Sequence, residues 1–219
     1  QYEQLNNRSD TLIDEKNIYY IFVSYKEFTN NKLLHSEKYL IYPNQLFHKK
    51  KYLYKKAKNY NYYFISSGSE IDIKNIMHLL KNIKLSNKIN LVGEISNSKE
   101  IFNKYSDKIN FMGYIDDINQ LYYSNQSVFL IPRYYGLGIP IKFLEALKFG
   151  SKCVLFGSHS RFGLPQKIIL PILKKNNFTE LDRFINSIDY KKVYTDISKY
   201  ILKNNKFFLN KFKNEINKL

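Results

Sequence analysis

The feature that most constrains the fold of this chain is the segment 128–156, in which two short apolar runs flank a glycine loop and a helical pattern. The first run, 128–131, is continuously apolar, as is typical of a strand buried on both faces. The second run, 153–156, has the same character. The order of strand, loop, helix and strand predicts one unit of a parallel α/β sheet.

The loop and the helix between the two runs carry their own terminal signals. Gly136 and Gly138 predict a flexible turn. Pro140 stands where a first helical residue should be, because its missing N–H costs nothing there, and Gly150 predicts the C-terminal cap. Helical spacing predicts one face with Ile141, Leu144 and Leu147 and another with Lys142, Glu145 and Phe149.

Glycines at such a junction suggest a binding site. They expose backbone N–H groups at the positive end of the helix dipole, which favours a phosphate. Glu145 lies one turn inside the helix, where a carboxylate can accept hydrogen bonds from sugar hydroxyls. The pattern therefore indicates a ligand that carries both a phosphate and a sugar.

The stretch 136–146 resembles the donor-binding signature of group-one glycosyltransferases with the GT-B fold, a nucleotide-sugar-dependent, retaining-type family. Its pattern is Gly-x-Gly-x-x-x-Lys-x-x-Glu-Ala, and the resemblance implies that Glu145 holds the nucleotide ribose. The best-known form of the motif has an earlier glutamate in the glycine loop, where this chain has Gly136 and Leu137. Nucleotide binding is therefore expected, and the handling of the donor sugar stays open.

From about residue 60, apolar runs alternate regularly with helical patterns. Ser69 and Asp72 form a capping box at the start of the first helical pattern. The alternation predicts a doubly wound, Rossmann-like parallel sheet whose loops meet at one edge, where ligands bind. The expected strands are 62–65, 89–93, 109–113, 128–131, 153–156 and 168–173, and the expected helices lie near 73–83, 99–105, 116–122, 140–149, 180–188 and from 190 onward.

Two further segments extend the resemblance over residues 60–190. The segment 111–118 is similar to the family's Phe-x-Gly-x-x-x-Asp-Leu segment, whose backbone contacts the nucleotide base. The segment 66–69 takes the place of the family's first glycine loop, near the diphosphate. There the common family has an arginine and a later lysine. This chain has Ser67 and Lys74, so the resemblance does not supply the complete arginine–lysine pair.

Several charged side chains have two interpretations each. Arg133 and Arg161 follow predicted strand ends, where they could bind a diphosphate or form surface salt bridges. Lys142 could pair with Glu145 or with phosphate, and His159 could face the cleft or be an uninvolved loop residue. The candidate donor-binding residues are Gly68, Gly113, Tyr114, Ile115, Arg133, Gly136, Leu137, Gly138, Ile139, Lys142 and Glu145, with no catalytic residue, cofactor or metal assigned.

Residues 1–50 are expected to be a remnant of the N-terminal, acceptor-side domain and its linker, and residues 51–219 the donor-binding domain. The chain begins with Gln1, which suggests an N-terminal truncation. Strands are expected at 18–24 and 39–42. In GT-B proteins the C-terminal helices often cross back to the partner domain, and the basic, amphipathic stretch from Tyr190 fits that role.

The composition indicates the compartment and leaves the role of the charge open. One cysteine excludes a disulfide framework, and Cys153 is expected to be inert packing in a reducing, cytoplasmic setting. No run approaches the roughly 18 apolar residues of a membrane span. The net charge of +16 could reflect lysine-rich drift of the surface, a peripheral position on the anionic inner face of a membrane, or, as the least favoured case, nucleic-acid binding.

The function expected from these residues is transfer of a sugar from a UDP- or GDP-linked donor to a glycan or lipid-linked acceptor, for cell-envelope polysaccharide or glycoconjugate synthesis. The alternatives are a nucleotide-sugar-binding module without catalysis, and a basic α/β protein that binds membrane or RNA. The residues leave the sugar, the base, the acceptor, the stereochemical course and the oligomeric state open.

Overall fold

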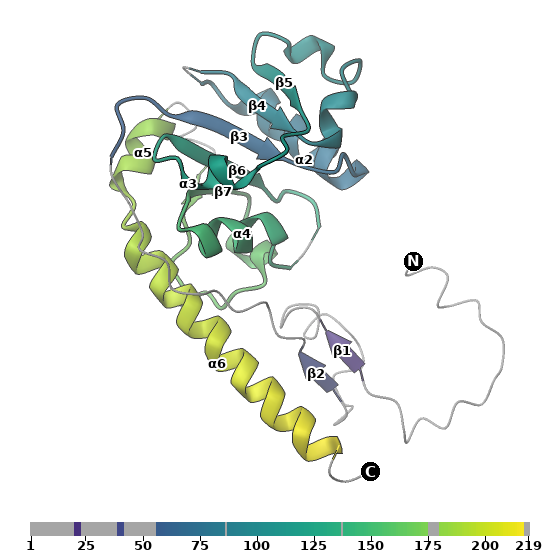
Figure 1. Cartoon of the computed structure of the whole chain (residues 1–219), viewed down its shortest axis with the longest axis vertical. Coiled ribbons are helices and arrows are strands. Elements are labelled where there is room, and N and C mark those ends of the chain that lie inside the picture. Colours follow the sequence, from purple (N-terminus) through teal and green to yellow (C-terminus); the bar gives the residue numbers. More distant parts are fainter. Residues whose placement is uncertain are drawn as a thin grey trace, which may run out of the picture.

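The computed structural model describes residues 20–22, 39–41, 56–85, 87–136, 138–174 and 180–216. The main body is a six-stranded sheet with helices on both faces (Figure 1). Its strands are β3 (Asn61–Ile65), β4 (Ile89–Val92), β5 (Ile109–Gly113), β6 (Ser127–Pro132), β7 (Lys152–Phe156) and β8 (Ile172–Leu173). Its helices are α2 (Glu70–Asn82), α3 (Asn119–Tyr123), α4 (Ile141–Phe149), α5 (Leu181–Ser187) and α6 (Tyr190–Ile216), with short 3-10 turns η2 (Glu94–Asn97), η3 (Asn103–Tyr105) and η4 (His159–Phe162).

The strand order is β5-β4-β3-β6-β7-β8, and every neighbouring pair is parallel. The chain therefore builds outward from β3 to β5, returns to the middle, and builds outward again from β6 to β8. This is the doubly wound, Rossmann-like architecture that the alternation predicts. The point where the order reverses lies between β3 and β6.

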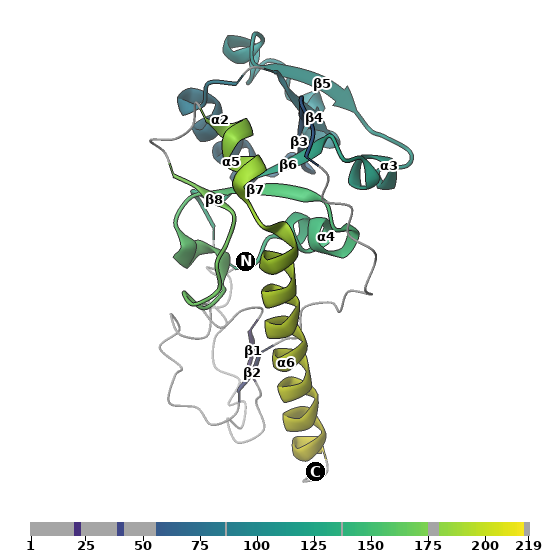
Figure 2. The same ribbon diagram turned by 90° about the vertical axis from the view of Figure 1, so that its left-hand side faces the viewer.

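The two faces of the sheet are covered by different helices. Tyr62 alternates with its neighbour Tyr63 along β3, so the two side chains point to opposite faces. Tyr62 donates its hydroxyl to Asp182 on α5, and Tyr63 lies beside Phe129 of β6, with ring centroids 5.9 Å apart. Figure 2 shows α2 and α5 on one side of the sheet and α3 and α4 on the other.

The core is built mainly from the central strands. All residues of β6 and β7 are buried, which explains why these two strands are continuous apolar runs without alternation. The last long helix is fixed to this core by Tyr190 and Tyr194, whose hydroxyls donate to the backbone carbonyls of Cys153 and Ser151. The Cys153 thiol is fully buried, and burial raises its pKa to about 12, as expected for inert packing.

Helix α6 runs beyond the sheet toward a second, small sheet. Strands β1 (Tyr20–Phe22) and β2 (Tyr39–Ile41) pair in parallel, and both lie within the strands expected in this region. Figures 1 and 2 agree that these two strands lie beside the far half of α6, and β2 contacts the helix. The division of the chain into domains at residue 50 stays a prediction.

Three expectations about the elements are wrong in detail. Residues 99–105 form turns ending in η3, because only Phe102 is buried there while Ile101 is 47% exposed. The strand expected at 168–173 is reduced to β8, since Pro171 can accept a hydrogen bond from Leu155 but cannot donate one. Helix α4 starts at Ile141 with Pro140 as its N-cap, and its buried residues are Phe143, Ala146 and Leu147. Of the face expected to hold Ile141, Leu144 and Leu147, only Leu147 is buried.

Candidate functional site

The candidate site lies where the two central strands separate. The β3–β6 ladder pairs Asn61 with Ser127 and ends at Tyr63 and Phe129. Beyond that point β3 stays paired with β4 as far as Ile65, and β6 stays paired with β7 as far as Pro132. The two strands therefore form a fork that opens toward their carboxyl ends, at the reversal point where ligands bind in doubly wound sheets.

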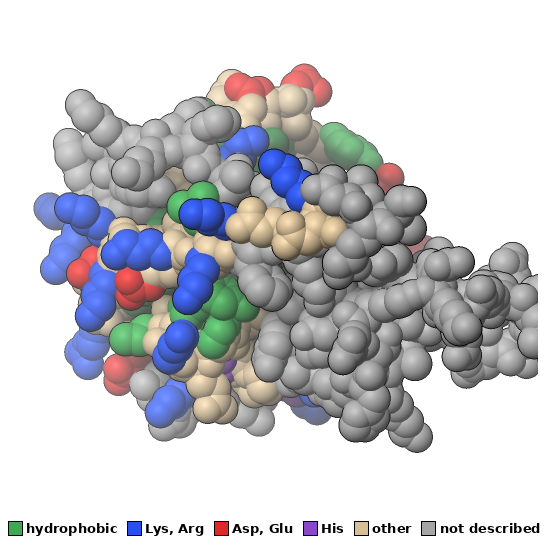
Figure 3. All heavy atoms as spheres, turned by 90° about the horizontal axis from the view of Figure 1, so that it is seen from below, with side chains coloured by type: hydrophobic (Ala, Val, Ile, Leu, Met, Phe, Trp, Pro, Cys, Tyr) green, Lys and Arg blue, Asp and Glu red, His purple; other side chains and the backbone are tan. Residues whose placement is uncertain are grey.

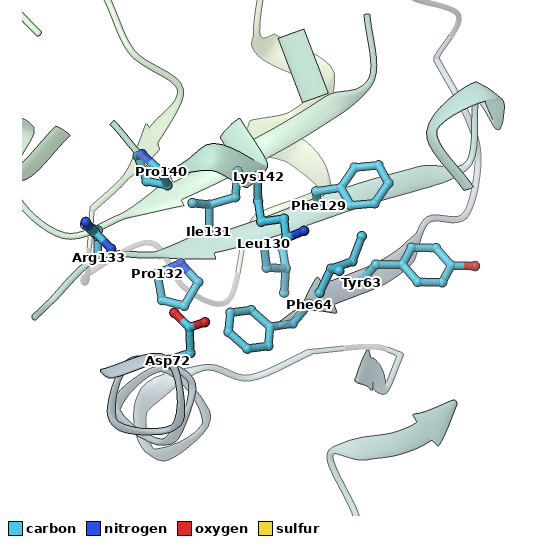
Figure 4. A pocket seen from close by; sticks show the side chains of 11 residues that line it. Tyr63, Phe64, Asp72, Phe129, Leu130, Ile131, Pro132, Arg133, Pro140 and Lys142 are labelled. Atoms are coloured by element: carbon cyan, nitrogen blue, oxygen red, sulfur yellow. The ribbon is translucent and has the colours of Figure 1, made fainter. Parts of the chain in front are cut away.

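A pocket occupies this fork (Figure 4). Its walls come from the ends of β3 and β6, from Asp72 on α2, and from Pro140 and Lys142 at the start of α4. The enclosed volume is about 50 Å³, enough for a phosphate-sized group and too small for a whole nucleotide, whose pockets are typically about 300 Å³ or more. The rest of any nucleotide must therefore lie along the open sheet edge.

The glycine loop between β6 and α4 is held in place from another helix. Asn75 of α2 is 1% exposed, and its Oδ1 accepts hydrogen bonds from the backbone N–H groups of Tyr134, at 2.7 Å, and Tyr135, at 2.9 Å. Its Nδ2 donates to the carbonyl of Tyr135 at 3.2 Å. His78, one turn later on α2, lies against the ring of Tyr134 with centroids 4.1 Å apart. The sequence carries no local signal for this role of Asn75, because its partners lie about 60 residues away.

The two candidate arginines meet at this loop. Arg161 Nη1 donates to the carbonyl of Gly136 at 3.3 Å. The guanidinium of Arg133 lies so close to Gly136 that a Cβ added there would stand 3.2 Å from Cζ, and Arg133 also lines the pocket. Gly136 and Gly138 both have positive φ, at 80° and 92°, which explains the glycines. Leu137 lies outside the described residues, and Ile139 is partly buried against the core.

The carboxylate of Glu145 is already hydrogen-bonded. Its Oε2 accepts from the hydroxyl of Tyr122 at 2.8 Å and lies 3.2 Å from Lys142 Nζ. Of the two alternatives for Lys142, the pair with Glu145 is thus present, and Lys142 also lines the pocket. Burial, and secondarily the charge of Glu145, raises the pKa of Tyr122, so its hydroxyl stays protonated and acts as the donor. Tyr122 is a second residue whose role has no local sequence signal.

The first loop, between β3 and α2, is closed by its own side chains. Ser69 is the N-cap of α2 and accepts from the N–H of Asp72 at 3.3 Å, which confirms half of the capping box. The Asp72 carboxylate does not complete the box; it accepts from Ser66 Oγ at 2.6 Å and lines the pocket. Gly68 has a φ of 77°, and its N–H donates to Ser66 Oγ. Lys74 pairs with Glu70 on the exposed side of α2, so the described loop brings no lysine to the pocket.

The segment expected to contact a base lies two strands from the fork. Gly113 ends β5 with a φ of 68°, and its N–H donates to Ser96 Oγ at 3.0 Å. Tyr114 is 71% exposed, and its hydroxyl donates to Glu94 at 2.8 Å. Ile115 follows, partly exposed. These residues therefore stand at the same sheet edge as the fork, separated from β6 by β3 and β4.

The two described histidines, His78 and His159, make structural contacts. His159 lies in η4, and its Nε2 hydrogen-bonds with the carbonyl of Ile168 at 2.8 Å, which favours the uninvolved alternative. His35 and His48 lie outside the described residues. Within the residues that the structure describes, no cluster of three or more histidine, cysteine or acidic side chains could hold a metal ion.

Comparison with known proteins gives a family match and a structure of similar fold. Residues 61–166 match a family model described as glycosyl transferases group 1. Among solved structures, the chain is similar to WaaG, a glycosyltransferase involved in lipopolysaccharide biosynthesis, with a TM-score of 0.53 and 12% identity over 82% of this chain and 57% of that one. Anabaena HepE, solved in complex with UDP and with UDP-glucose, gives TM-scores of 0.47 and 0.44 at 14% and 16% identity, over 71% and 72% of this chain and 49% of the other. No curated protein matches the sequence.

Proposed function

Residues 61–166 form a group 1 glycosyltransferase domain, and from this premise we propose that the domain binds the nucleoside diphosphate of a sugar donor at the fork between β3 and β6. The chain spans 57% of the length of WaaG, so sugar-transfer activity is proposed for this chain and does not follow from the structural likeness. The donor is a UDP- or GDP-linked sugar, and the acceptor is a glycan or a lipid-linked saccharide of the cell envelope.

The observation that carries this proposal is the chemistry at the N-terminus of α4. The helix has no acidic residue in its first turn, and its N-cap Pro140 makes no side-chain hydrogen bond. The positive end of its dipole therefore faces the pocket without a carboxylate of its own, and Lys142 and Arg133 line the same pocket. A diphosphate supplies the negative charge that this arrangement favours.

The dimensions of the sheet edge suit an extended nucleotide. Neighbouring strands are about 4.8 Å apart, so the distance from β6 across β3 and β4 to β5 is about 14 Å. We propose that the diphosphate lies at Gly136–Ile139, that Glu145 accepts from the ribose hydroxyls, and that the base lies along Gly113–Ile115. Such a site accelerates sugar transfer by positioning the donor and by stabilising the negative charge of the leaving group.

The proposed reaction breaks the bond between the anomeric carbon of the sugar and the diphosphate oxygen. A hydroxyl oxygen of the acceptor forms the new bond to that carbon, the nucleoside diphosphate leaves, and the proton of the hydroxyl passes to the leaving diphosphate or to solvent. Arg133 and Lys142 are the cations placed to stabilise the negative charge that the diphosphate gains as it leaves.

A second proposal concerns the charged surface. The net charge is +16, and Figure 3 shows lysine and arginine side chains outnumbering acidic ones on one side of the molecule. The exposed lysines in the described part of α6 are Lys191, Lys192, Lys199, Lys203, Lys206 and Lys213. No helix in the described parts of the chain could cross a bilayer. We propose a peripheral position on anionic lipid, where each well-placed cation contributes about 1 kcal/mol. Binding to phosphatidylserine vesicles should then fall steeply with salt, and no binding at low salt would contradict this proposal.

Nucleotide binding can be tested by thermal unfolding of the full chain. A ligand that binds only the native state must stabilise it, by about 2.7 kcal/mol at 100 times its Kd. We expect UDP, GDP or one of their sugar conjugates to raise the Tm, and free ribose and inorganic phosphate to have little effect. Transfer of a radiolabelled sugar from the stabilising donor to envelope lipids would test the reaction. No Tm change with any of these nucleotides would rule the proposal out.

A further inference from the structure

Tyr122 connects the interior of the domain to the carboxylate of Glu145. It lies on the short helix α3, and the residue is 3% exposed. Its hydroxyl is aimed outward at α4, where it donates to Glu145 Oε2 at 2.8 Å. The buried Tyr122 side chain thus donates a hydrogen bond to the partly exposed carboxylate of Glu145.

The ring of Tyr122 is fixed on both faces. Phe129 of β6 stacks on one side, with centroids 4.4 Å apart and an interplanar angle of 23°. Phe149 at the end of α4 stacks at 4.8 Å and 14°. Ser151 donates its hydroxyl to the Tyr122 carbonyl at 2.5 Å. The hydroxyl therefore has little freedom, because a strand, a helix end and a backbone contact all determine where the ring lies.

The two contacts on Glu145 differ in how well they orient it. The Lys142 pair is an i,i+3 ion pair whose side chains are 41% and 35% exposed, and such surface pairs fix little. The Tyr122 ring is held in a rigid stack, so its hydroxyl is the contact that can hold the Glu145 carboxylate in one orientation. In the described part of the chain both contacts fall on Oε2, which leaves Oε1 to accept from a ligand.

We propose that Tyr122 is a positioning residue for the donor site: its buried hydroxyl sets the orientation in which Glu145 presents Oε1 to the ribose hydroxyls. This inference rests on the proposed function, in which Glu145 receives the ribose. The further step is that the preference for ribose over deoxyribose depends partly on Tyr122, a residue that does not contact the ligand. Pre-organisation of this kind improves affinity by reducing the ordering that binding requires.

The test uses Tyr122→Phe, which keeps the aromatic stack and removes only the hydroxyl. The matched control is Tyr123→Phe, the neighbouring tyrosine on α3, which is 53% exposed. Calorimetry measures the Kd of each 219-residue variant for UDP and for 2′-deoxy-UDP, or for GDP and 2′-deoxy-GDP if the chain binds guanine. Comparing two ligands in one protein separates the ribose contact from any general loosening of the fold.

We expect Tyr122→Phe to weaken UDP binding by about three- to ten-fold, the range of a modest hydrogen-bond contribution, while the affinity for 2′-deoxy-UDP changes less than two-fold. Tyr123→Phe should leave both affinities unchanged. Equal losses for the two ligands, or no loss for either, would overturn the role of Tyr122 and leave the proposed function standing. Failure of the unmodified chain to bind any of the four nucleotides would instead overturn the proposed function.

Discussion

The two strand-to-helix junctions at the fork are stabilised in opposite ways. The β3–α2 junction supplies its own contacts: Ser69 caps the helix, and Asp72 accepts from Ser66 within the same loop. The first turn of α2 also carries two acidic residues, Glu70 and Asp72. The positive end of this helix is therefore already compensated by carboxylates of the chain itself.

The described residues of the β6–α4 junction provide no comparable helix cap. Its N-cap Pro140 makes no side-chain bond, and the loop is held by Asn75 from α2 and by Arg161 from η4. A helix start without its own carboxylate, next to cations, remains able to attract an anion. The β3–α2 junction is thus stabilised by its own residues. The β6–α4 junction depends on distant residues, and the positive potential at the start of its helix is left available to a ligand.

The largest effect is expected where the second junction depends on one side chain. Asn75→Ala removes three hydrogen bonds and leaves two backbone N–H groups of the loop without their partner. We expect the free energy of unfolding to fall by about 3 kcal/mol, measured by urea denaturation. The control is Asn82→Ala on the same helix, which removes one bond to a helix carbonyl and should cost about 1 kcal/mol or less. Equal losses would show that the loop does not depend on Asn75.

The next effect concerns binding. Glu145→Ala should weaken UDP or GDP binding by roughly 1.5 to 3 kcal/mol, the range for hydrogen bonds to a charged group. Calorimetric titration would measure it. Glu180→Ala is a suitable control, because Glu180 also forms an i,i+3 ion pair, with Arg183. Unchanged affinity in the Glu145 variant would remove that residue from the site.

A smaller effect of opposite sign is expected at the first junction. Asp72 places a carboxylate in the pocket, where it repels an anionic ligand. Asp72→Asn should therefore strengthen nucleotide binding by about 1 kcal/mol, while stability decreases slightly through the weaker bond to Ser66. Asp189→Asn, at the start of α6, changes the net charge equally and should leave the affinity unaltered. Weaker binding by the Asp72 variant would mean that the carboxylate assists the ligand.

The smallest effect separates stability from binding. Ser69→Ala removes the N-cap of α2 and should lower the free energy of unfolding by about 1 kcal/mol. Nucleotide affinity should stay the same, because this junction does not carry the proposed diphosphate contacts. Thermal unfolding with and without UDP measures both quantities in one experiment. Loss of the ligand-induced Tm increase would contradict the division of roles between the two junctions.

The sequence predicted the sheet well because its signals are local. The fully buried strands β6 and β7 are continuous apolar runs, and Gly150 caps α4 with a φ of 67°, as expected. The pairing of Lys142 with Glu145 was one of two alternatives, and a spacing of three residues on one helix is enough to suggest it. Periodicity and short spacing are enough for such features.

The parts that could not be predicted depend on contacts between distant segments. Asn75 looked like one polar residue in a helix, and Tyr122 like one aromatic residue among many, because their partners are about 60 and 23 residues away. The buried face of α4 was misjudged for a related reason: the surface against which a helix packs selects Phe143 and leaves Ile141 71% exposed. Spacing alone does not contain that information.

The short β3–β6 ladder has a consequence for how the domain assembles and opens. It joins strands more than 60 residues apart through three residue pairs, whereas β6 and β7 align over five pairs and are only about 20 residues apart. Closing the longer loop costs more chain entropy and returns fewer backbone bonds. The two halves of the sheet should therefore form early as separate units, and the β3–β6 ladder between them should open more easily than the β6–β7 ladder. Amide exchange along β3 and β6 would measure how readily the β3–β6 ladder opens. A ligand bound in the fork contacts both strands and would therefore stabilise this ladder against opening.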